Sequence, residues 1–289
     1  MPFYDYLEVG SCDFNTELVS NNNLKGISIE PIKYYYDNLI NKEGCIKINI
    51  GISDKEGEEI IHYITPENIE KYEFHHDIKG SNSLYSNHKY VNLEIKKKGL
   101  NYDDIITKEQ IQVKPLYSIY KEYDLKNIFH LKIDTEGHDK IIIHKFLNDI
   151  QTNDELPFLI SFESNYLIST YDTIQIYSRL EAMGYDLLVK TIDNSFLQLN
   201  LTRLKNKTKF SEEFKGYYIK FYPENYDPNN LPHENTLEGA QKYCKEHNYT
   251  GITYQYGRYE VRTGKSIFPE YINKELKTID RNVSSWVYL

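Results

Sequence analysis

The chain opens with Tyr4-Asp5-Tyr6-Leu7-Glu8-Val9-Gly10, continues with Ser11-Cys12-Asp13-Phe14-Asn15, and reaches Gly26-Ile27-Ser28-Ile29-Glu30-Pro31. The apolar runs predict two short strands joined by a tight turn and a helix, with Glu30 ending the second strand. Glu30 follows Gly10 by 20 residues, the separation at which a doubly wound nucleotide site places a carboxylate on ribose hydroxyls. Glycine allows the backbone to approach a ligand closely, and the acid accepts two hydrogen bonds from a vicinal diol. The stretch therefore predicts a site for a molecule that contains adenosine.

The turn after Gly10 narrows the choice of ligand. Dinucleotide sites and P-loops use several glycines to wrap phosphate with backbone amides. Here Ser11, Cys12, Asp13 and Phe14 follow, without a second glycine or a lysine. An acid in this turn repels pyrophosphate and suits the cationic sulfonium and ammonium groups of S-adenosylmethionine. We therefore expect S-adenosylmethionine as the cofactor; the simpler alternative is an ordinary strand-turn-helix with a surface glutamate.

The composition argues against several classes of protein. The 289 residues suit one large domain, or a domain of about 200 residues with a small appendage. The formal net charge of −9, with no basic block beyond Lys96-Lys97-Lys98, argues against a nonspecific grip on nucleic acid. Three widely spaced cysteines form no CxxC or zinc pattern and indicate a reduced intracellular setting.

No segment points to a membrane. The first strand follows Met1 and Pro2 almost at once, which leaves no room for a signal peptide, and no apolar run approaches about 18 residues. We expect a cytoplasmic protein with neither membrane nor nucleic acid as partner. Its many Tyr, Asn, Ile and Lys residues resemble the products of AT-rich genomes, large DNA viruses among them, for which the location would be host cytoplasm or virion.

Strand-like and helix-like segments alternate over residues 1–222, which predicts an α/β domain with a mostly parallel sheet. After the two opening strands, further strands are expected at 46–50, 60–63, 128–133, 158–163, 185–190, 196–199 and 216–222. Helices are expected at 31–40, 141–146 and 174–183. The polar segment 64–90 is typical of a long functional or mobile loop.

The C-terminal part has its own pattern. Residues 223–232, rich in Pro, Asn and Asp, predict a linker, and residues 233–289 predict a small α+β accessory module. Within it we expect a helix at 236–247, two strands at 251–262 around a turn at Gly257, and a last strand at 284–289. Its tyrosines suit stacking on sugar rings, and they suit a small hydrophobic core equally well.

Three of the expected strands end in acidic residues, namely Glu30, Asp134 and Glu163. In an open α/β sheet, ligands bind at the carboxyl ends of strands, near the switch in strand order. These acids would then face one cleft, together with the Gly10 turn. A solvated loop carboxylate is the more common explanation for each acid alone, but an unpaired carboxylate is costly to bury, so the coincidence of three is informative.

The segment Asp134-Thr135-Glu136-Gly137-His138-Asp139 concentrates titratable groups. Methyl transfer to a hydroxyl requires a proton acceptor, for which Asp134 and His138 are the candidates, with Glu136 beside them. Asp134 would alternatively hold the methionine amino group. The competing explanation is a helix N-terminus, which favours acids through the helix dipole.

We expect no metal site in this segment. A divalent cation bound by Asp134, Glu136 and Asp139 would need side chains that point different ways on a helix. The histidines of the polar loop, His75-His76 and His88, are expected to be solvated rather than to act as ligands.

Six segments occur together in the order of a known family: Leu7-Glu8-Val9-Gly10, Ile29-Glu30-Pro31, residues 49–57, Lys79-Gly80-Ser81-Asn82-Ser83-Leu84, residues 131–139 and Ile160-Ser161-Phe162-Glu163. Over residues 4–222 the chain thereby resembles the FkbM family of S-adenosylmethionine-dependent methyltransferases, and residues 132–139 are the most specific part. The resemblance implies a class I methyltransferase fold, Rossmann-like, with a seven-stranded, mostly parallel sheet and one antiparallel strand. It also implies methyl transfer to oxygen, with a sugar, glycan or other small molecule as acceptor.

The resemblance implies roles for individual residues. It places at the cofactor Glu8, Gly10, Ser11, Cys12, Asp13, Glu30, Pro31, Asn49, Ile50, Gly51 and Asp134, with the first five beside the methionine half and residues 49–51 near the adenine. Asn82, Ser83 and Glu163 are expected at the acceptor. Two departures from the family pattern are the missing second glycine around residues 12–14 and the missing helix before the first strand.

Two other functions stay open. A catalytically inactive methyltransferase fold would serve as a glycan- or protein-binding module, and binding of S-adenosylmethionine distinguishes it from the enzyme. A nucleic acid methyltransferase is disfavoured by the acidic charge and by the absence of an Asn/Asp-Pro-Pro-Tyr motif.

Overall fold

The computed structural model describes residues 4–14, 16, 18, 24–86, 88–203, 210, 213–215, 217–219, 221–224, 236–265, 267–269 and 283–288. The chain divides into two compact units, residues 1–180 with 187–197 and residues 181–186 with 198–289. The helix expected between the first two strands and most of the expected linker at 223–232 lie outside the described residues. The domain boundaries therefore stay a prediction.

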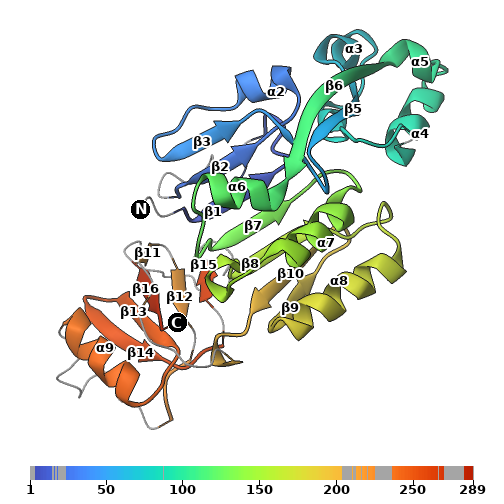
Figure 1. Cartoon of the computed structure of the whole chain (residues 1–289). Coiled ribbons are helices and arrows are strands. Elements are labelled where there is room, and N and C mark those ends of the chain that lie inside the picture. Colours follow the sequence, from blue (N-terminus) through green and yellow to red (C-terminus); the bar gives the residue numbers. More distant parts are fainter. Residues whose placement is uncertain are drawn as a thin grey trace. The chain divides into compact units, whose positions relative to one another are not determined.

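The largest sheet has seven strands in the order β3-β2-β1-β7-β8-β10-β9 (Figure 1). Its strands are β1 (Tyr6–Val9), β2 (Gly26–Ile29), β3 (Cys45–Ile48), β7 (His130–Ile133), β8 (Leu159–Glu163), β9 (Tyr185–Lys190) and β10 (Asn194–Leu199). Each neighbouring pair from β3 to β8 is parallel. The expectation of an α/β fold with a large, mostly parallel sheet is confirmed.

The strand order reverses between β1 and β7. From β1 the chain adds β2 and then β3 on one side, and it later returns to add β7 and β8 on the other side. Every residue of β1, β2 and β8 is buried, as is usual for strands of parallel sheets. The reversal creates a switch point at the carboxyl ends of β1 and β7, where open α/β sheets bind ligands.

Four helices accompany these strands: α2 (Lys33–Asn38), α6 (Leu116–Glu122), α7 (Asp139–Asp149) and α8 (Thr170–Ala182). The helix α7 buries Ile142, Ile143, Phe146 and Leu147, a helical spacing of three and four residues that forms one apolar face. Phe146 packs on Tyr120 of α6, with ring centroids 4.9 Å apart. The helices expected at 31–40, 141–146 and 174–183 are confirmed as α2, α7 and α8, although α7 and α8 begin earlier than the apolar spacing indicated.

A second sheet in the first unit has the order β4-β6-β5. It consists of β4 (Gly51–Ser53), β5 (Gly57–Ile64) and β6 (Ile106–Pro115), with β5 antiparallel and β4 parallel to β6. Ile61 and Ile111 of this sheet join a buried cluster with Ile32, Tyr35 and Cys12. The small sheet thus packs against the turn that follows β1.

The expectation of an irregular segment at residues 64–90 is wrong for much of its length. It contains α3 (Pro66–Lys71) and the 3₁₀ helix η1 (His76–Gly80), and α4 (Lys89–Lys97) and α5 (Tyr102–Ile105) follow. Thr65 starts α3 by accepting a hydrogen bond from the Asn68 amide at 3.2 Å, and Pro66 occupies the first helical position. A hydrophobic cluster that includes Phe74, Ile78 and Val91 holds these elements together.

The second unit is α+β. Its helix α9 (Leu237–Glu246) accompanies a four-stranded sheet, β11-β16-β13-β14, and the pair β12-β15. The strands are β11 (Phe214–Lys215), β12 (Tyr217–Ile219), β13 (Gly251–Gln255), β14 (Arg258–Arg262), β15 (Ile267–Pro269) and β16 (Ser284–Val287). The expected helix, hairpin and last strand are confirmed, whereas the strand expected at 216–222 pairs with β15 and does not extend the seven-stranded sheet.

Several tyrosines of this unit belong to its core. Tyr243, Tyr249 and Tyr259 pack against a buried cluster that contains Ala240 and Cys244. Their packing accounts for them without a sugar ligand.

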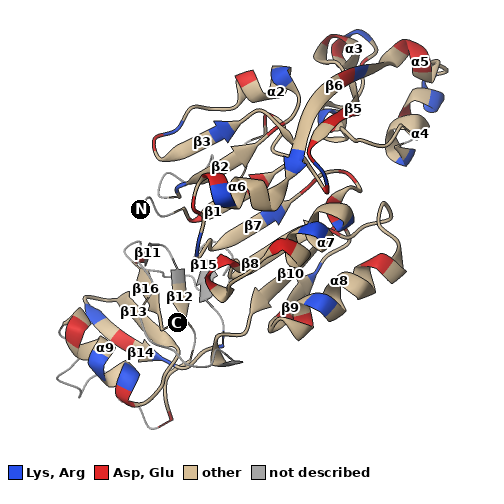
Figure 2. Cartoon of the chain, viewed as in Figure 1, with Lys and Arg blue, Asp and Glu red and all other residues tan. Residues whose placement is uncertain are grey.

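Acidic and basic side chains are interspersed on the described helices of both units (Figure 2). None of the described helices is both long and apolar enough to cross a membrane.

Candidate functional site

The register of the parallel strands brings the predicted residues to one edge of the sheet. Val9, Ile29 and Ile48 are partners across β1, β2 and β3, and Val9, Ile133 and Phe162 are partners across β1, β7 and β8. The residues that come next along each strand or directly after it are Gly10, Glu30, Asn49, Asp134 and Glu163. The edge therefore carries three carboxylates, as the sequence predicted.

Glu30 is fixed in the wall of a pocket. It is 3% exposed, and its Oε2 accepts a hydrogen bond from the Cys12 amide at 2.7 Å while its Oε1 accepts one from the Ile32 amide at 2.8 Å. Burial raises its pKa to about 7, although the two amides favour the charged form. The carboxylate is thus oriented by the backbone, and each oxygen keeps a lone pair for a further donor.

Position 10 requires a glycine because of a contact within the protein rather than a contact with a ligand. Its φ is +84°, and a Cβ at this position would lie 1.8 Å from the carbonyl oxygen of Asp134. The glycine therefore allows the backbone after β1 to approach the end of β7 closely. Gly10 also lines the pocket. Any side chain here would push apart the turns that follow β1 and β7.

The pocket encloses about 560 Å³, including its part open to solvent. Nine residues predicted at the site line it, namely Gly10, Cys12, Glu30, Pro31, Ile50, Gly51, Asn82, Asp134 and His138. The other lining residues are Val9, Ile29, Ile52, Ile61, Gly80, Leu84, Ile111 and Thr135. Sequence reasoning missed this second group, of which Ile52, Ile61 and Ile111 come from the small sheet.

Four predicted cofactor residues do not line this pocket. Glu8 is fully buried, and its Oε1 lies 3.2 Å from Lys132 Nζ. The hydroxyl groups of Ser11 and Ser28 are hydrogen-bonded to each other. The side-chain amide of Asn49 donates a hydrogen bond to the Glu30 carbonyl oxygen at 2.9 Å.

Asp13 is the fourth of these residues, and its carboxylate forms an ion pair with Lys79 at 2.5 Å. The negative charge expected to face a cationic ligand is therefore neutralised at Asp13. Asp134 does line the pocket, and its Oδ2 lies 3.7 Å from Lys132 Nζ.

His138, one of the two predicted proton acceptors, is held by a serine. It lines the pocket, and its Nε2 lies 3.0 Å from the hydroxyl oxygen of Ser53. Burial lowers its pKa, so the imidazole is neutral at neutral pH. Among the described residues, its buried Nδ1 has no hydrogen-bond partner.

Residues 134–138 do not form the helix turn that the sequence suggested. Glu136 has φ +52° and Gly137 has φ +96°, and α7 begins only at Asp139. Carboxylate oxygens of Asp134, Glu136 and Glu163 consequently lie within 4.8 Å of one another. The expectation that the acids of this segment point different ways is wrong for Asp134 and Glu136.

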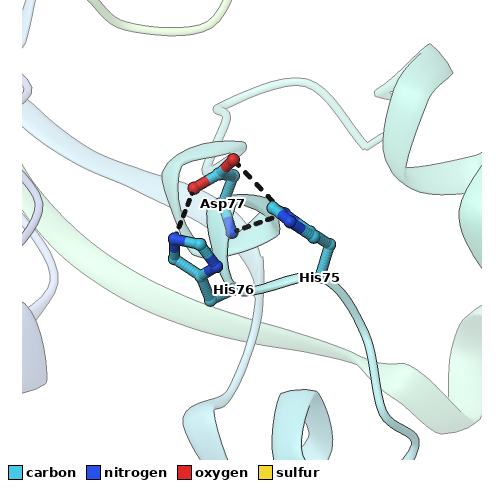
Figure 3. Close-up of side chains that lie close together, drawn as sticks. All are labelled: His75, His76 and Asp77. Atoms are coloured by element: carbon cyan, nitrogen blue, oxygen red, sulfur yellow. Dashed lines mark hydrogen bonds and ion pairs between the residues drawn. The ribbon is translucent and has the colours of Figure 1, made fainter.

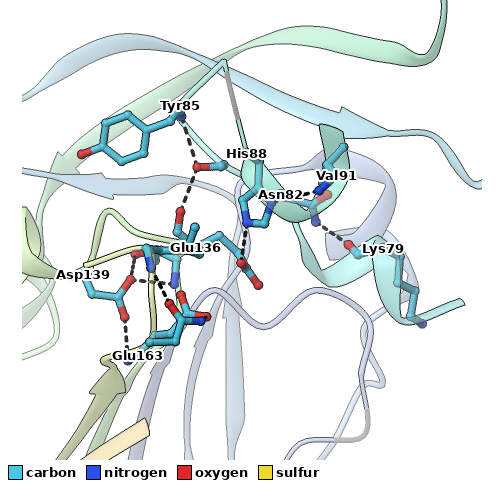
Figure 4. A network of polar contacts seen from close by, with 12 residues as sticks. Lys79, Asn82, Tyr85, His88, Val91, Glu136, Asp139 and Glu163 are labelled. Atoms are coloured by element: carbon cyan, nitrogen blue, oxygen red, sulfur yellow. Dashed lines mark hydrogen bonds and ion pairs between the residues drawn. The ribbon is translucent and has the colours of Figure 1, made fainter. Parts of the chain in front are cut away.

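Asp139, by contrast, has a structural role. It is fully buried, and its carboxylate accepts hydrogen bonds from the Thr135 hydroxyl at 2.7 Å, the Thr135 amide at 3.2 Å and the Glu163 amide at 2.9 Å (Figure 4). Burial raises its pKa to about 7. Asp139 therefore ties the turn after β7 to the end of β8.

Glu136 and Glu163 are also held by neighbours (Figure 4). Glu136 Oε2 lies 2.8 Å from His88 Nε2, and the Glu136 carbonyl oxygen accepts a hydrogen bond from the Ser83 hydroxyl at 2.9 Å. Glu163 Oε1 accepts a hydrogen bond from the side-chain amide of Asn165 at 2.5 Å. Burial raises the pKa of Glu136 to about 9 and that of Glu163 to about 10, and neighbouring carboxylates add to both increases. Ser83, Glu136 and Glu163, predicted at the site, thus lie together beside the pocket.

The loop histidines divide into two kinds. His75 and His76 are exposed and flank Asp77 at 3.2 and 2.8 Å, as expected for solvated residues (Figure 3). For His88 this expectation is wrong: it is 6% exposed and starts α4 by accepting a hydrogen bond from the Val91 amide at 3.4 Å. The bond uses the backbone N–H of residue 91, which almost any residue would supply, so the sequence carried no signal for it.

Comparison with known proteins identifies the class of protein that this fold and site define, a methyltransferase. The model of the FkbM methyltransferase domain matches residues 7–187. The chain belongs to the FkbM methyltransferase family. No curated protein and no solved structure matches the chain.

Proposed function

We propose that the protein is an S-adenosylmethionine-dependent O-methyltransferase of class I fold, acting on a hydroxyl of a sugar, a glycan or another small molecule. Family membership supports methyl transfer. The strand order, with its reversal between β1 and β7, supports the fold class. The observation that carries the cofactor assignment is the buried carboxylate of Glu30 in the pocket wall at this switch point.

The pocket fits the nucleoside part of the cofactor. Ile29, Ile50, Ile52 and Ile111 give one side of it an apolar lining beside Glu30, which suits an adenine next to a ribose. Glu30 would accept hydrogen bonds from both ribose hydroxyls, because its oxygens are already oriented by the Cys12 and Ile32 amides.

The remaining polar residues suit the chemistry. The cofactor, when bound, supplies a methyl group on a positively charged sulfur. Asp134 would hold the cationic methionine end, since it lines the pocket and its backbone lies next to Gly10. His138 would take the proton from the acceptor hydroxyl, and its bond to Ser53 orients the ring for this role. Binding and alignment of the acceptor supply the rest of the rate enhancement.

Calorimetric titration of the purified chain with S-adenosylmethionine tests the cofactor assignment. We expect one site, weakened about 100-fold in Glu30→Ala, because two hydrogen bonds to a charged group contribute about 1.5 kcal/mol or more each. The exposed Glu43→Ala is the matched control and should bind as the parent does. Glu30→Gln, which keeps the shape of the side chain, separates lost affinity from misfolding.

The same titration distinguishes the proposed enzyme from an inactive methyltransferase fold that only binds a partner. No heat at millimolar cofactor would favour a binding module on an inactive scaffold. Cofactor binding that survives unchanged in both Glu30 variants would remove the ribose assignment.

A further inference from the structure

The carboxyl ends of β7 and β8 hold a group of three carboxylates that the proposed mechanism uses only in part. Asp134, Glu136 and Glu163 each place an oxygen within 4.8 Å of the other two. Glu163 is 7% exposed, and among the described residues nothing donates a hydrogen bond to its buried Oε2. A buried carboxylate oxygen without a donor is costly, so this atom calls for a ligand.

Neighbouring residues hold two of these side chains in place. His88 and Asn165 each bond one oxygen, of Glu136 and Glu163 respectively, so the carboxylates are fixed in orientation (Figure 4). Outer partners of this kind are typical of metal ligands. The backbone of Glu136 is left-handed, which is uncommon for a residue other than glycine, and the Ser83 hydroxyl bonds its carbonyl. The local chain is thus held in a conformation that turns Glu136 toward the other acids.

We propose that Asp134, Glu136 and Glu163 form a binding site for a hard divalent cation such as Mg²⁺, Mn²⁺ or Ca²⁺. Carboxylate oxygens are the preferred ligands of these ions. Two oxygens bound to one Ca²⁺ can lie at most about 4.6–5.2 Å apart, and the three carboxylate oxygens lie within 4.8 Å of one another, so they are close enough to share such an ion.

The place of this site suggests its use. Asp134 belongs both to the acidic group and to the pocket wall, so a bound cation would lie at the edge of the pocket. Its remaining coordination positions would take oxygens of the acceptor. This part rests on the proposed methyl transfer and favours acceptors that offer two neighbouring oxygens, such as a sugar diol.

The exposed group of His75, His76 and Asp77 provides an internal control for surface binding. It also brings three ligand atoms together, but all three side chains are solvated (Figure 3). A cation held there would be lost in Asp77→Asn. A cation held by the buried group would not be.

Calorimetry and electron paramagnetic resonance with MnCl₂ on the full-length chain, previously dialysed against EDTA, test the proposal. We expect one saturable site, weakened at least tenfold by Glu163→Gln and by Glu136→Gln but not by Asp77→Asn. Titrations with MgCl₂ and CaCl₂ identify the preferred ion. Circular dichroism of each variant shows whether it is folded.

Absence of saturable Mn²⁺ binding to the unsubstituted chain would overturn the proposal without recourse to variants. Binding that persists in Glu163→Gln and disappears in Asp77→Asn would overturn it as well. Cofactor titration of the metal-free protein is a separate readout: if the cofactor fails to bind while Mn²⁺ binds as expected, the proposed function fails and the metal site stands.

Discussion

Replacement of Gly10 by alanine tests the arrangement that brings β1 and β7 together at the site. The new Cβ would lie 1.8 Å from the Asp134 carbonyl oxygen, which is backbone and cannot rotate away. A left-handed alanine costs about 1–2 kcal/mol, and relief of overpacking by a backbone shift costs about 1–3 kcal/mol more. We expect a total loss of about 3 kcal/mol in the free energy of unfolding.

Gly99→Ala is the matched control. Gly99 is also left-handed, at φ +68°, but nothing lies within 4 Å of its Cβ position, so only the conformational cost of about 1 kcal/mol applies. Thermal unfolding followed by far-ultraviolet circular dichroism should show a Tm for Gly10→Ala at least about 4 °C below that of Gly99→Ala, since each kcal/mol shifts Tm by about 2–4 °C in a unit of this size. Equal losses in the two variants would refute the close contact between the turns.

Three further predictions address the charged and titratable groups. Burial raises the native pKa of Glu30 to about 7 from an ordinary 4.5, so its contribution to stability is lost as pH rises through 7. Urea unfolding should show the free energy of unfolding of Glu30→Gln rising, relative to that of the parent, by up to roughly 3 kcal/mol between pH 5 and pH 8.5. A pH-independent difference would contradict this. His138→Asn should lower methyl-transfer turnover about 100-fold in single-turnover assays while cofactor affinity is unchanged, whereas His75→Asn should alter neither. Glu260→Ala should destabilise the second unit by about 3 kcal/mol, because it removes the buried ion-pair partner of Arg262. Trp286 fluorescence during unfolding measures this loss, with the exposed Glu246→Ala as control. Equal stability of the two variants would refute the prediction.

The residues at the sheet edge were predictable because the sequence pattern marks where each strand ends. Buried parallel strands read as short apolar runs, and a polar residue directly after such a run marks its carboxyl end. Glu30, Asp134 and Glu163 all follow this rule, and the register confirms that they share one edge. Which carboxylate oxygens meet was not predictable in the same way.

The convergence of Asp134, Glu136 and Glu163 depends on a left-handed backbone at Glu136. Such a conformation at a residue other than glycine has no signal in one sequence. A helix start at residues 134–139, the competing explanation that the sequence left open, would have sent these side chains apart. The helix dipole argument applied instead to Asp139, where α7 does begin.

One strand of the small sheet, β5, was predictable in part from the apolar run at 60–63, whereas β6 was not. Only Ile106, Ile111 and Val113 are buried in β6, and most positions between them are charged or amide side chains. Because Ile111 and Val113 share one face of the strand and Ile106 lies on the other, the sequence of β6 shows no regular period-two pattern. The pocket wall that it supplies through Ile111 could not be placed without the structure.

The turn after β1 explains why a glycine-poor loop belongs in this site. In phosphate-binding turns the backbone amides point at the ligand. Here the Gly10 and Ser11 amides donate to the Ile29 carbonyl at 3.0 and 3.3 Å, and the Cys12 amide donates to Glu30 Oε2 at 2.7 Å. The first three amides of the turn are thus bonded to the end of β2, so none of them is left for a pyrophosphate. The same bonds aim the Glu30 carboxylate, which means that the features excluding a dinucleotide are those that prepare the acid for a ribose.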